Sequence, residues 1–112
     1  MTEAGYLLPD EAPTHDEISN TAGPVLLEFG TDWCGICRAL APQVEGLVEK
    51  HPAVRHVKVE DGPGLPLGRS FRVKLWPSLV FLKDGAVVRQ LVRPSVPELK
   101  AAFAELVPPP TA

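Results

Sequence analysis

The chain has 112 residues, enough for one domain of ordinary size. A composition that is 45% apolar and 22% charged excludes an intrinsically disordered chain, and no apolar run reaches the roughly 18 residues of a membrane span. The net charge of −3 is unevenly spread, because residues 1–37 hold seven acidic residues and no Lys or Arg, whereas residues 38–112 hold seven acidic and all eleven basic residues. Six of the basic residues lie close together in the chain: Arg69, Arg72, Lys74, Lys83, Arg89 and Arg93. Because no exposed aromatic residues are interleaved with them, they indicate a solvated face or a surface for an acidic protein partner, and not nucleic-acid binding.

Two residue types are unusual in number. The 13 prolines are about twice the average share, and there are only two cysteines, Cys34 and Cys37. Two cysteines cannot hold together a secreted mini-protein, and the first residues lack the basic and apolar regions of a signal peptide. We therefore expect a soluble, cytoplasmic protein without membrane association, and a monomer as the default.

The first elements are predicted from turn residues and capping signals. Residues 1–13 form a turn-rich extension with at most a short edge strand at residues 6–8. Thr14 and Glu17 form a capping box, which begins a short helix that ends before Gly23. The apolar residues 25–29 then indicate a buried strand that carries one acid, Glu28.

Residues 35–50 are predicted to form a helix, because apolar residues recur along one face from Cys37 to Val48. Pro42 lies inside this pattern and should kink the helix, since proline lacks an N–H and crowds the preceding turn. The later elements follow in chain order: a strand at 54–59, a helical turn that buries Leu67 and Phe71, a strand at 79–82, a hairpin turn at Asp84 and Gly85 with a returning strand at 87–92, and a helix from a second capping box at Ser95 to Leu106.

This order predicts an α/β domain over residues 14–107, with helices on both faces of a sheet. The proline-rich residues 108–112 are expected to form a flexible tail. No internal repeat divides the chain.

Cys34 and Cys37 allow three interpretations. They could be two buried thiols without a function, or they could bind zinc together with His51 and His56, because this spacing approaches a Cys2His2 pattern. However, His51 precedes a helix-ending proline and His56 falls in a strand pattern, so the two histidines would not share one helix face. A redox-active pair is the interpretation that the positions favour.

The redox interpretation has a physical reason for each cysteine. Cys34 lies at the N-terminus of the predicted helix, where free N–H groups and the helix dipole favour a thiolate. It should therefore be the nucleophile. Cys37 lies one turn further on the apolar stripe, so it should be buried and act as the resolving thiol. Gly35 should let the turn between them close tightly.

Three segments resemble the thioredoxin family. Residues 25–29 with Trp33-Cys-Gly-Ile-Cys37 are similar to its active-site strand, loop and helix, Pro42 matches its helix-kinking proline, and Trp76-Pro77-Ser78 resembles its cis-proline loop. These matches span about residues 24–106 in the family's order. The resemblance implies the thioredoxin fold, a central mixed sheet of four to five strands flanked by helices on both faces.

The resemblance also implies a function. The chain would be a thiol-disulfide oxidoreductase that reduces protein disulfides through Cys34 and Cys37, without metal or small cofactor, and is itself reduced by a thioredoxin-reductase-type electron donor. Glu28 matches the family's buried acid, which could relay the proton of Cys37, and Lys58 fits its nearby lysine. A substrate peptide would pair as an added strand with Trp76 beside a cis Pro77. Further contacts would come from the rim of the site: Trp33, Gly35, Ile36 and Arg93.

Four positions depart from the family pattern. Ile36 replaces the proline of the usual reducing motif, so the dipeptide between the cysteines does not reveal the redox potential. Gly30 stands where the family often has an aromatic or small residue near the cysteines. Trp76 is bulkier than the usual residue before the cis-proline, and Arg93 stands near a usual glycine. These changes indicate a narrower set of substrates, and they leave open a binding or assembly-helper module with a specialised partner.

Overall fold

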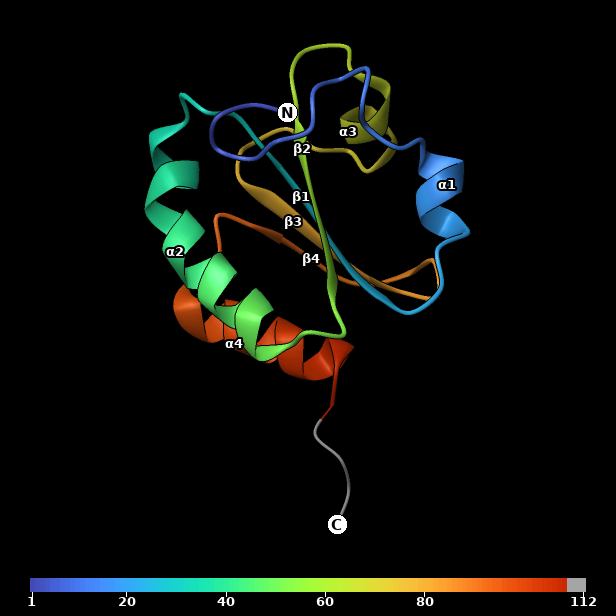
Figure 1. The fold of residues 1–112 in the computed structure, drawn as a ribbon, viewed down its shortest axis with the longest axis vertical. Helices are drawn as coiled ribbons and strands as arrows, with labels where there is room; N and C mark the ends of the chain where they lie inside the picture. Colours follow the sequence, from blue (N-terminus) through green and yellow to red (C-terminus); the bar gives the residue numbers. More distant parts are fainter. Residues whose placement is uncertain (109–112) are drawn as a thin grey trace.

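The computed structural model describes residues 1–108 (Figure 1). The predicted tail at 108–112 therefore lies, beyond its first residue, outside the described part of the chain. The elements agree with the predicted order: α1 (His15–Ser19), β1 (Pro24–Gly30), α2 (Gly35–Lys50), β2 (Arg55–Glu60), α3 (Pro66–Ser70), β3 (Ser78–Lys83), β4 (Ala86–Val92) and α4 (Val96–Leu106). Both predicted capping boxes are present, at Thr14 and at Ser95.

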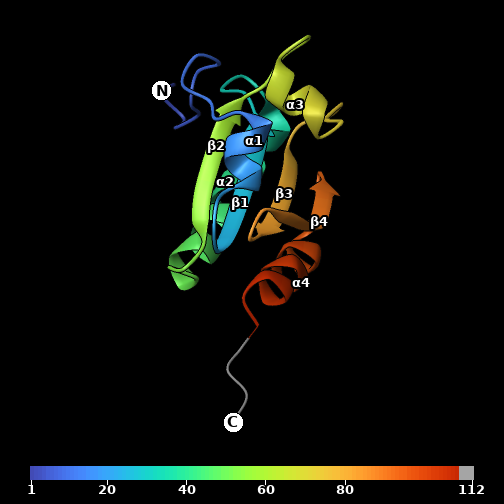
Figure 2. The same cartoon turned by 90° about the vertical axis from the view of Figure 1, so that its right-hand side faces the viewer.

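The strands form one mixed sheet in the order β2-β1-β3-β4. β1 pairs parallel with β2 and antiparallel with β3, and β4 pairs antiparallel with β3. Helices α2 and α4 cover one face and α1 and α3 the other, as Figures 1 and 2 show. The predicted thioredoxin fold is confirmed. Of the possible edge strand at residues 6–8, the structure contains a single parallel bridge between Leu7 and Val59.

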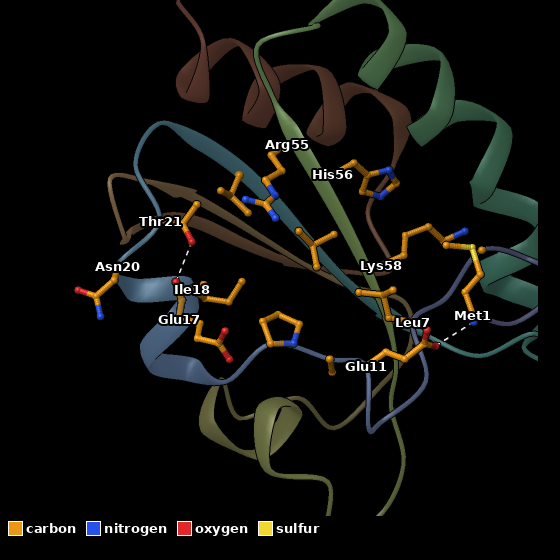
Figure 3. A pocket seen from close by; sticks show the side chains of 15 residues that line it. Met1, Leu7, Glu11, Glu17, Ile18, Asn20, Thr21, Arg55, His56 and Lys58 are labelled. Carbon is orange, nitrogen blue, oxygen red and sulfur yellow. Dashed lines mark hydrogen bonds and ion pairs between the residues drawn. The ribbon is translucent and has the colours of Figure 1, made fainter.

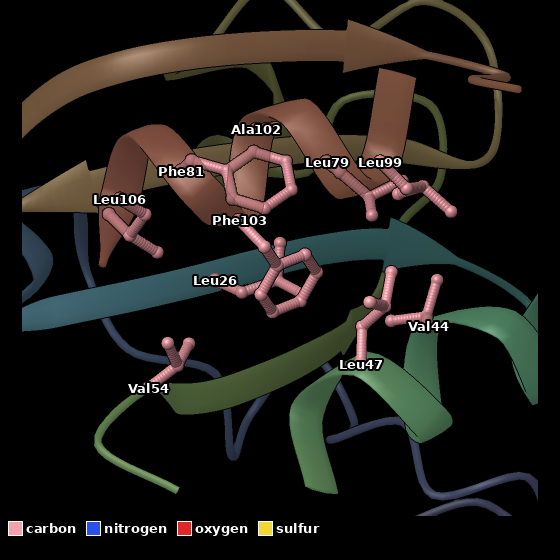
Figure 4. Close-up of a cluster of buried hydrophobic side chains, with 10 residues drawn as sticks. All are labelled: Leu26, Val44, Leu47, Val54, Leu79, Phe81, Leu99, Ala102, Phe103 and Leu106. Atoms are coloured by element: carbon pink, nitrogen blue, oxygen red, sulfur yellow. The ribbon is translucent and has the colours of Figure 1, made fainter. Parts of the chain in front are cut away.

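The central strand β1 divides its side chains between two hydrophobic clusters, because successive residues of a strand point to opposite faces. Leu26 joins the cluster beneath α2 and α4, in which Phe81 and Phe103 meet edge to face (Figure 4). Leu27 and Phe29 join the cluster beneath α1 and α3. The alternation places the next residues of the Leu26 face, Glu28 and Gly30, on the side of α2, whose first turn carries the two cysteines.

The β3–β4 hairpin depends on two residues with left-handed backbone conformations. Asp84 has φ of 50° and Gly85 has φ of 81°, which suits the tight two-residue turns whose twist matches that of the strands. The Asp84 carboxylate also accepts a hydrogen bond from the Gly23 N–H at 2.8 Å. A Cβ atom on Gly85 would lie 1.9 Å from the backbone oxygen of Ser19.

We expect Gly85→Ala to lower the free energy of unfolding by roughly 3 kcal/mol, because the new methyl group meets backbone and because alanine disfavours a positive φ. Chemical denaturation followed by circular dichroism measures the change. Gly46→Ala is the matched control, since Gly46 lies in α2 and a Cβ atom there would meet no heavy atom within 4 Å. The free energy of unfolding of the Gly46→Ala variant should be about 0.5–1 kcal/mol higher than that of the parent protein. Equal stabilities for the two variants would contradict the prediction.

Candidate active site

The two cysteines meet at the first turn of α2. Cys34 is the N-cap residue, and its sulfur accepts hydrogen bonds from the Cys37 N–H at 3.3 Å and from the Cys37 thiol at 2.6 Å. Both are free thiols. Cys34 is half-buried, whereas Cys37 is only 1% exposed. The pair therefore presents one sulfur to solvent and holds the other behind it, as the helical spacing predicts.

The buried position keeps Cys37 protonated. Burial is the largest cause that raises the pKa of Cys37, to about 12, and the hydrogen bond with Cys34 acts in the same direction. The backbone N–H of Thr31 and the Tyr6 hydroxyl act in the opposite direction by hydrogen bonding to the Cys37 sulfur. Cys37 is thus a neutral thiol that donates to Cys34 in the dithiol state.

Tyr6 and Gly30 occupy the space beside Cys37. Tyr6 is 2% exposed. A Cβ on Gly30 would lie 2.6 Å from the Tyr6 hydroxyl oxygen and 2.9 Å from the Cys37 sulfur, so only glycine leaves room for both. The aromatic side chain near the cysteines, which the family often places at position 30, here comes from residue 6. Sequence analysis missed this role of Tyr6, for which the only signal was an apolar triplet in a polar segment.

Glu28 is buried on the same face of the sheet and pairs with a histidine. Its side chain is 2% exposed, and its Oε1 lies 2.7 Å from His56 Nε2. Lys58 stands opposite Glu28 in the register of β1 and β2. Its ammonium group, however, donates to the Ala4 carbonyl at 2.8 Å and lies 4.2 Å from the centre of the Tyr6 ring. The strands bring the two predicted residues side by side, but the partner of the acid is His56.

The zinc interpretation is wrong for this arrangement. His51 follows the C-terminal end of α2, far from Cys34 at the other end, and its ring donates from Nδ1 to the Leu47 carbonyl at 2.8 Å. His56 Nε2 is hydrogen-bonded to the Glu28 carboxylate. Within residues 1–108, no group of three or more His, Cys, Asp or Glu side chains could hold a metal ion.

Pro42 and Gly35 are the two residues of α2 for which the sequence predicted a backbone role. Pro42 lies inside the helix, where it removes one backbone donor, and α2 continues through it to Lys50. Gly35 has no positive φ, and a Cβ there would meet no heavy atom within 4 Å. The tight turn therefore does not require glycine at position 35. Gly35 instead leaves the surface next to Cys34 open.

Exposed apolar side chains flank the half-buried Cys34 in the chain and lie in the neighbouring loop before β3. Trp33 is 74%, Ile36 44% and Leu75 50% exposed. The rings of Trp33 and Trp76 meet edge to face with centroids 5.5 Å apart, which brings the loop before α2 next to the loop before β3. Such exposed apolar side chains beside a reactive group are typical of an interaction surface.

Trp76 is held by contacts on both its side chain and its backbone. Its ring N–H donates to Asp61 Oδ2 at 2.8 Å, and its carbonyl accepts from Arg93 Nε at 2.9 Å. The Trp76–Pro77 peptide bond is cis, and the Arg93 N–H donates to the Pro77 carbonyl at 3.0 Å. Asp61 was also missed by sequence analysis, since nothing in the chain pattern joins it to a residue 15 positions away.

The sheet is mixed, a dithiol lies at the N-terminus of α2, and a cis-proline loop lies beside that dithiol. These features together define the class of thioredoxin-fold dithiol proteins. The model of the Thioredoxin family matches residues 9–105. Thioredoxin Asp f 28 of Aspergillus fumigatus is 31% identical over 88 residues, which cover 79% of this chain and 82% of that protein. An H-type thioredoxin of Ricinus communis is 30% identical over 87 residues, covering 78% of this chain and 74% of that protein.

Solved structures are also similar to this chain. The structure of thioredoxin 2 from Pseudomonas aeruginosa PAO1 in its reduced form superposes with a TM-score of 0.76 and 56% sequence identity, covering 86% of this chain and 90% of that one. The chain belongs to the thioredoxin family. It is a protein-disulfide oxidoreductase, and the spacing of its two cysteines, Cys34 and Cys37, fits the CxxC motif. No helix within residues 1–108 is long and apolar enough to cross a membrane.

Proposed function

We propose that this protein reduces disulfides of other proteins, with Cys34 as the nucleophile and Cys37 as the resolving thiol. The observation that carries the proposal is the order of the two sulfurs: a half-buried Cys34 faces outwards, and a buried Cys37 lies 2.6 Å behind it. Attack from outside is therefore directed to Cys34. Only Cys37 is placed to attack Cys34 from the inside.

The reaction then balances in two exchanges. The Cys34 thiolate attacks one sulfur of the substrate disulfide, forms a mixed disulfide and expels the other sulfur as a thiolate. Cys37 loses its proton, for which Glu28 is the proposed acceptor, and attacks Cys34. The Cys34–Cys37 bond forms, and the second substrate sulfur leaves with the electron pair. Two electrons pass from the protein to the substrate, whose two thiolates take up protons.

The substrate is proposed to bind along the loop that contains Trp76 and Pro77. An extended peptide can pair with this backbone as an added strand, while Trp33, Gly35 and Ile36 border its approach to Cys34. The Arg93 side chain already donates to the Trp76 carbonyl. A substrate strand must share or displace that bond, which supports a narrower range of substrates.

The proposal includes a dithiol state that is restored by an external thioredoxin-reductase-type donor, because the sequence contains no third cysteine that could reduce the Cys34–Cys37 disulfide. It also includes a role for Lys58, whose ammonium lies on the Tyr6 ring beside Cys37, and a monomer that acts in the cytoplasm. A reducing compartment suits a protein whose two cysteines must return to the dithiol state.

Reduction of insulin disulfides by dithiothreitol tests this function. We expect the protein to accelerate the precipitation of the insulin B chain in catalytic amounts. Addition of the protein after alkylation of its thiols is the control and should leave only the background rate. If the untreated protein also gave only the background rate, the proposed reductase function would be wrong.

A further inference from the structure

The N-terminal segment is fastened to the edge of the sheet next to the active site. The Leu7 N–H donates to the Lys58 carbonyl at 2.8 Å, and the Glu60 N–H donates to the Leu7 carbonyl at 2.9 Å. The Met1 amino group pairs with Glu11 at 2.9 Å, and both residues line a groove of about 780 Å³ that is bordered by this segment, α1 and β2 (Figure 3). These contacts hold the backbone on both sides of Tyr6.

The Tyr6 side chain points from this segment into the protein. The backbone N–H of Tyr6 donates to Thr2 Oγ1 at 3.0 Å, and the Tyr6 carbonyl accepts from the Thr2 N–H at 2.7 Å. Residues 2–6 therefore form a short closed loop. The Lys58 ammonium covers the Tyr6 ring. With 2% of the residue exposed, the hydroxyl group must find its hydrogen-bond partner inside the protein.

That partner is Cys37. The hydroxyl and the Cys37 sulfur both border the small space above Gly30, where a Cβ atom would lie 2.6 Å from the first and 2.9 Å from the second, and hydrogen bonding between the two side chains contributes to the pKa of both groups. Burial, together with the nearby Glu28 and Cys37, raises the pKa of Tyr6 far above its usual value. The hydroxyl therefore keeps its proton and can act only as a donor towards an anion.

We propose that Tyr6 is a catalytic residue of the resolving step: its hydroxyl donates a hydrogen bond to the Cys37 sulfur and stabilises the thiolate that attacks the mixed disulfide. This inference rests on the proposed function, because it assigns a partner to the resolving thiol. It makes the N-terminal segment, up to the bridge at Leu7, a part of the active site.

The need for such a donor follows from the change in Cys37 during the reaction. In the dithiol state Cys37 donates its own proton to Cys34. Once Cys34 is bound to a substrate sulfur, Cys37 must become an anion at a position where only 1% of the residue is exposed to solvent. A buried anion without hydrogen-bond donors is costly. Thr31 supplies one donor from its backbone N–H, and Tyr6 supplies the second from its side chain.

The proton and the electrons of this step balance without Tyr6 being consumed. Cys37 gives its proton to a base, and the Tyr6 O–H remains intact while it donates to the resulting thiolate. That thiolate forms the bond to the Cys34 sulfur, and the bond between Cys34 and the substrate sulfur breaks. When the disulfide has formed, the negative charge has moved to the departing substrate sulfur, and the hydrogen bond from Tyr6 weakens.

Tyr6→Phe tests the proposal, since it keeps the ring between Lys58 and Gly30 and removes only the hydroxyl. The probe is an aromatic disulfide that releases a coloured thiolate twice, first when Cys34 attacks and again when Cys37 resolves the product. In rapid-mixing experiments the first release should be unchanged. The second should be about tenfold slower at neutral pH, and its pH–rate profile should move to higher pH, as expected for the loss of one hydrogen bond to an anion.

A second measurement does not depend on any substrate. In a Cys34→Ser background Cys37 is the only thiol, and its alkylation by iodoacetamide in alkaline buffer reports its thiolate fraction. Adding Tyr6→Phe should slow this alkylation about tenfold. Because it follows Cys37 itself, this result can be read even if the protein fails to reduce insulin, so the two proposals fail separately.

Leu8→Ala is the matched control, because Leu8 lies in the same segment and its side chain is partly exposed. It should leave both releases unchanged. The proposal is overturned if Tyr6→Phe leaves the second release and the alkylation rate as in the parent protein. It is also overturned if Tyr6→Phe slows both releases equally, or if Leu8→Ala reproduces its effect, because Tyr6 would then act only by holding the segment in place.

Discussion

Replacing Cys34 by serine is expected to abolish insulin reduction, with a loss of at least about a thousandfold, because a serine hydroxyl is not a nucleophile towards a disulfide without a base to activate it. Replacing Cys37 by serine should give a different failure. The outward-facing Cys34 still attacks, but nothing behind it can break the mixed disulfide. This variant should accumulate covalent adducts with substrate proteins, which non-reducing gels followed by mass spectrometry detect.

The comparison between these two variants is informative because the substitutions are the same in chemistry and differ only in position. Gly46→Ala keeps both thiols and serves as the control, with insulin reduction as in the parent protein. If Cys34→Ser formed the adducts and Cys37→Ser did not, the roles of the two cysteines would be reversed. Such a result would contradict the order of exposure seen in the structure.

Iodoacetamide is expected to label the folded dithiol protein at Cys34 alone. Burial raises the pKa of Cys37 to about 12, and a raised pKa means that the neutral thiol persists as the pH increases. At pH 8 only roughly one Cys37 in ten thousand would be a thiolate, the form that reacts. Cys34, half-buried at the start of α2, is accessible. Mass spectrometry of proteolytic fragments measures the label on each cysteine.

Labelling in guanidinium chloride is the control for this experiment. Unfolding removes the burial that raises the pKa of Cys37, so its pKa returns towards the usual value near 8.5 and both cysteines should be labelled. If Cys37 were labelled as fast as Cys34 in the folded protein at pH 8, Cys37 would be more accessible to solvent than the structure shows. Labelling of Cys37 in the folded protein should become faster as the pH rises towards 12, because its thiolate fraction increases as the pH approaches its pKa.

Most of the fold could be predicted from local signals. The capping boxes at Thr14 and Ser95 mark helix starts because the side chains that satisfy the free N–H groups lie within one turn of them. The turn at Asp84 and Gly85 is equally local, since its φ values depend on those two residues. The central mixed sheet was expected from the family resemblance, and the structure confirms it; the pairing of β1 with both β2 and β3 came only from the structure.

From residue spacing alone, the site could be predicted only where its residues are near neighbours in the chain, whereas the cis Pro77 and the buried Glu28 were expected from the family resemblance. Cys34 and Cys37 are one helical turn apart, so helix geometry alone places one outside and one inside. Lys58 was expected beside Glu28, and the sheet register does place it there. Yet a lysine side chain is long and flexible, and its ammonium goes to Ala4 and Tyr6, while the acid binds His56. Register can be inferred from a pattern, but the direction of a long side chain cannot.

The sequence by itself determined that two of its residues would form a reactive dithiol, because their spacing, the helix start and the apolar stripe all lie within a few residues of one another. Only the tertiary structure decided what surrounds the buried thiol. Tyr6 reaches Cys37 from 31 positions away, through the small space that Gly30 leaves open. Asp61 reaches Trp76 in the same way. These contacts depend on how the N-terminal segment and the loops meet at one end of the sheet, and the free energy of such packing is decided by all the elements together.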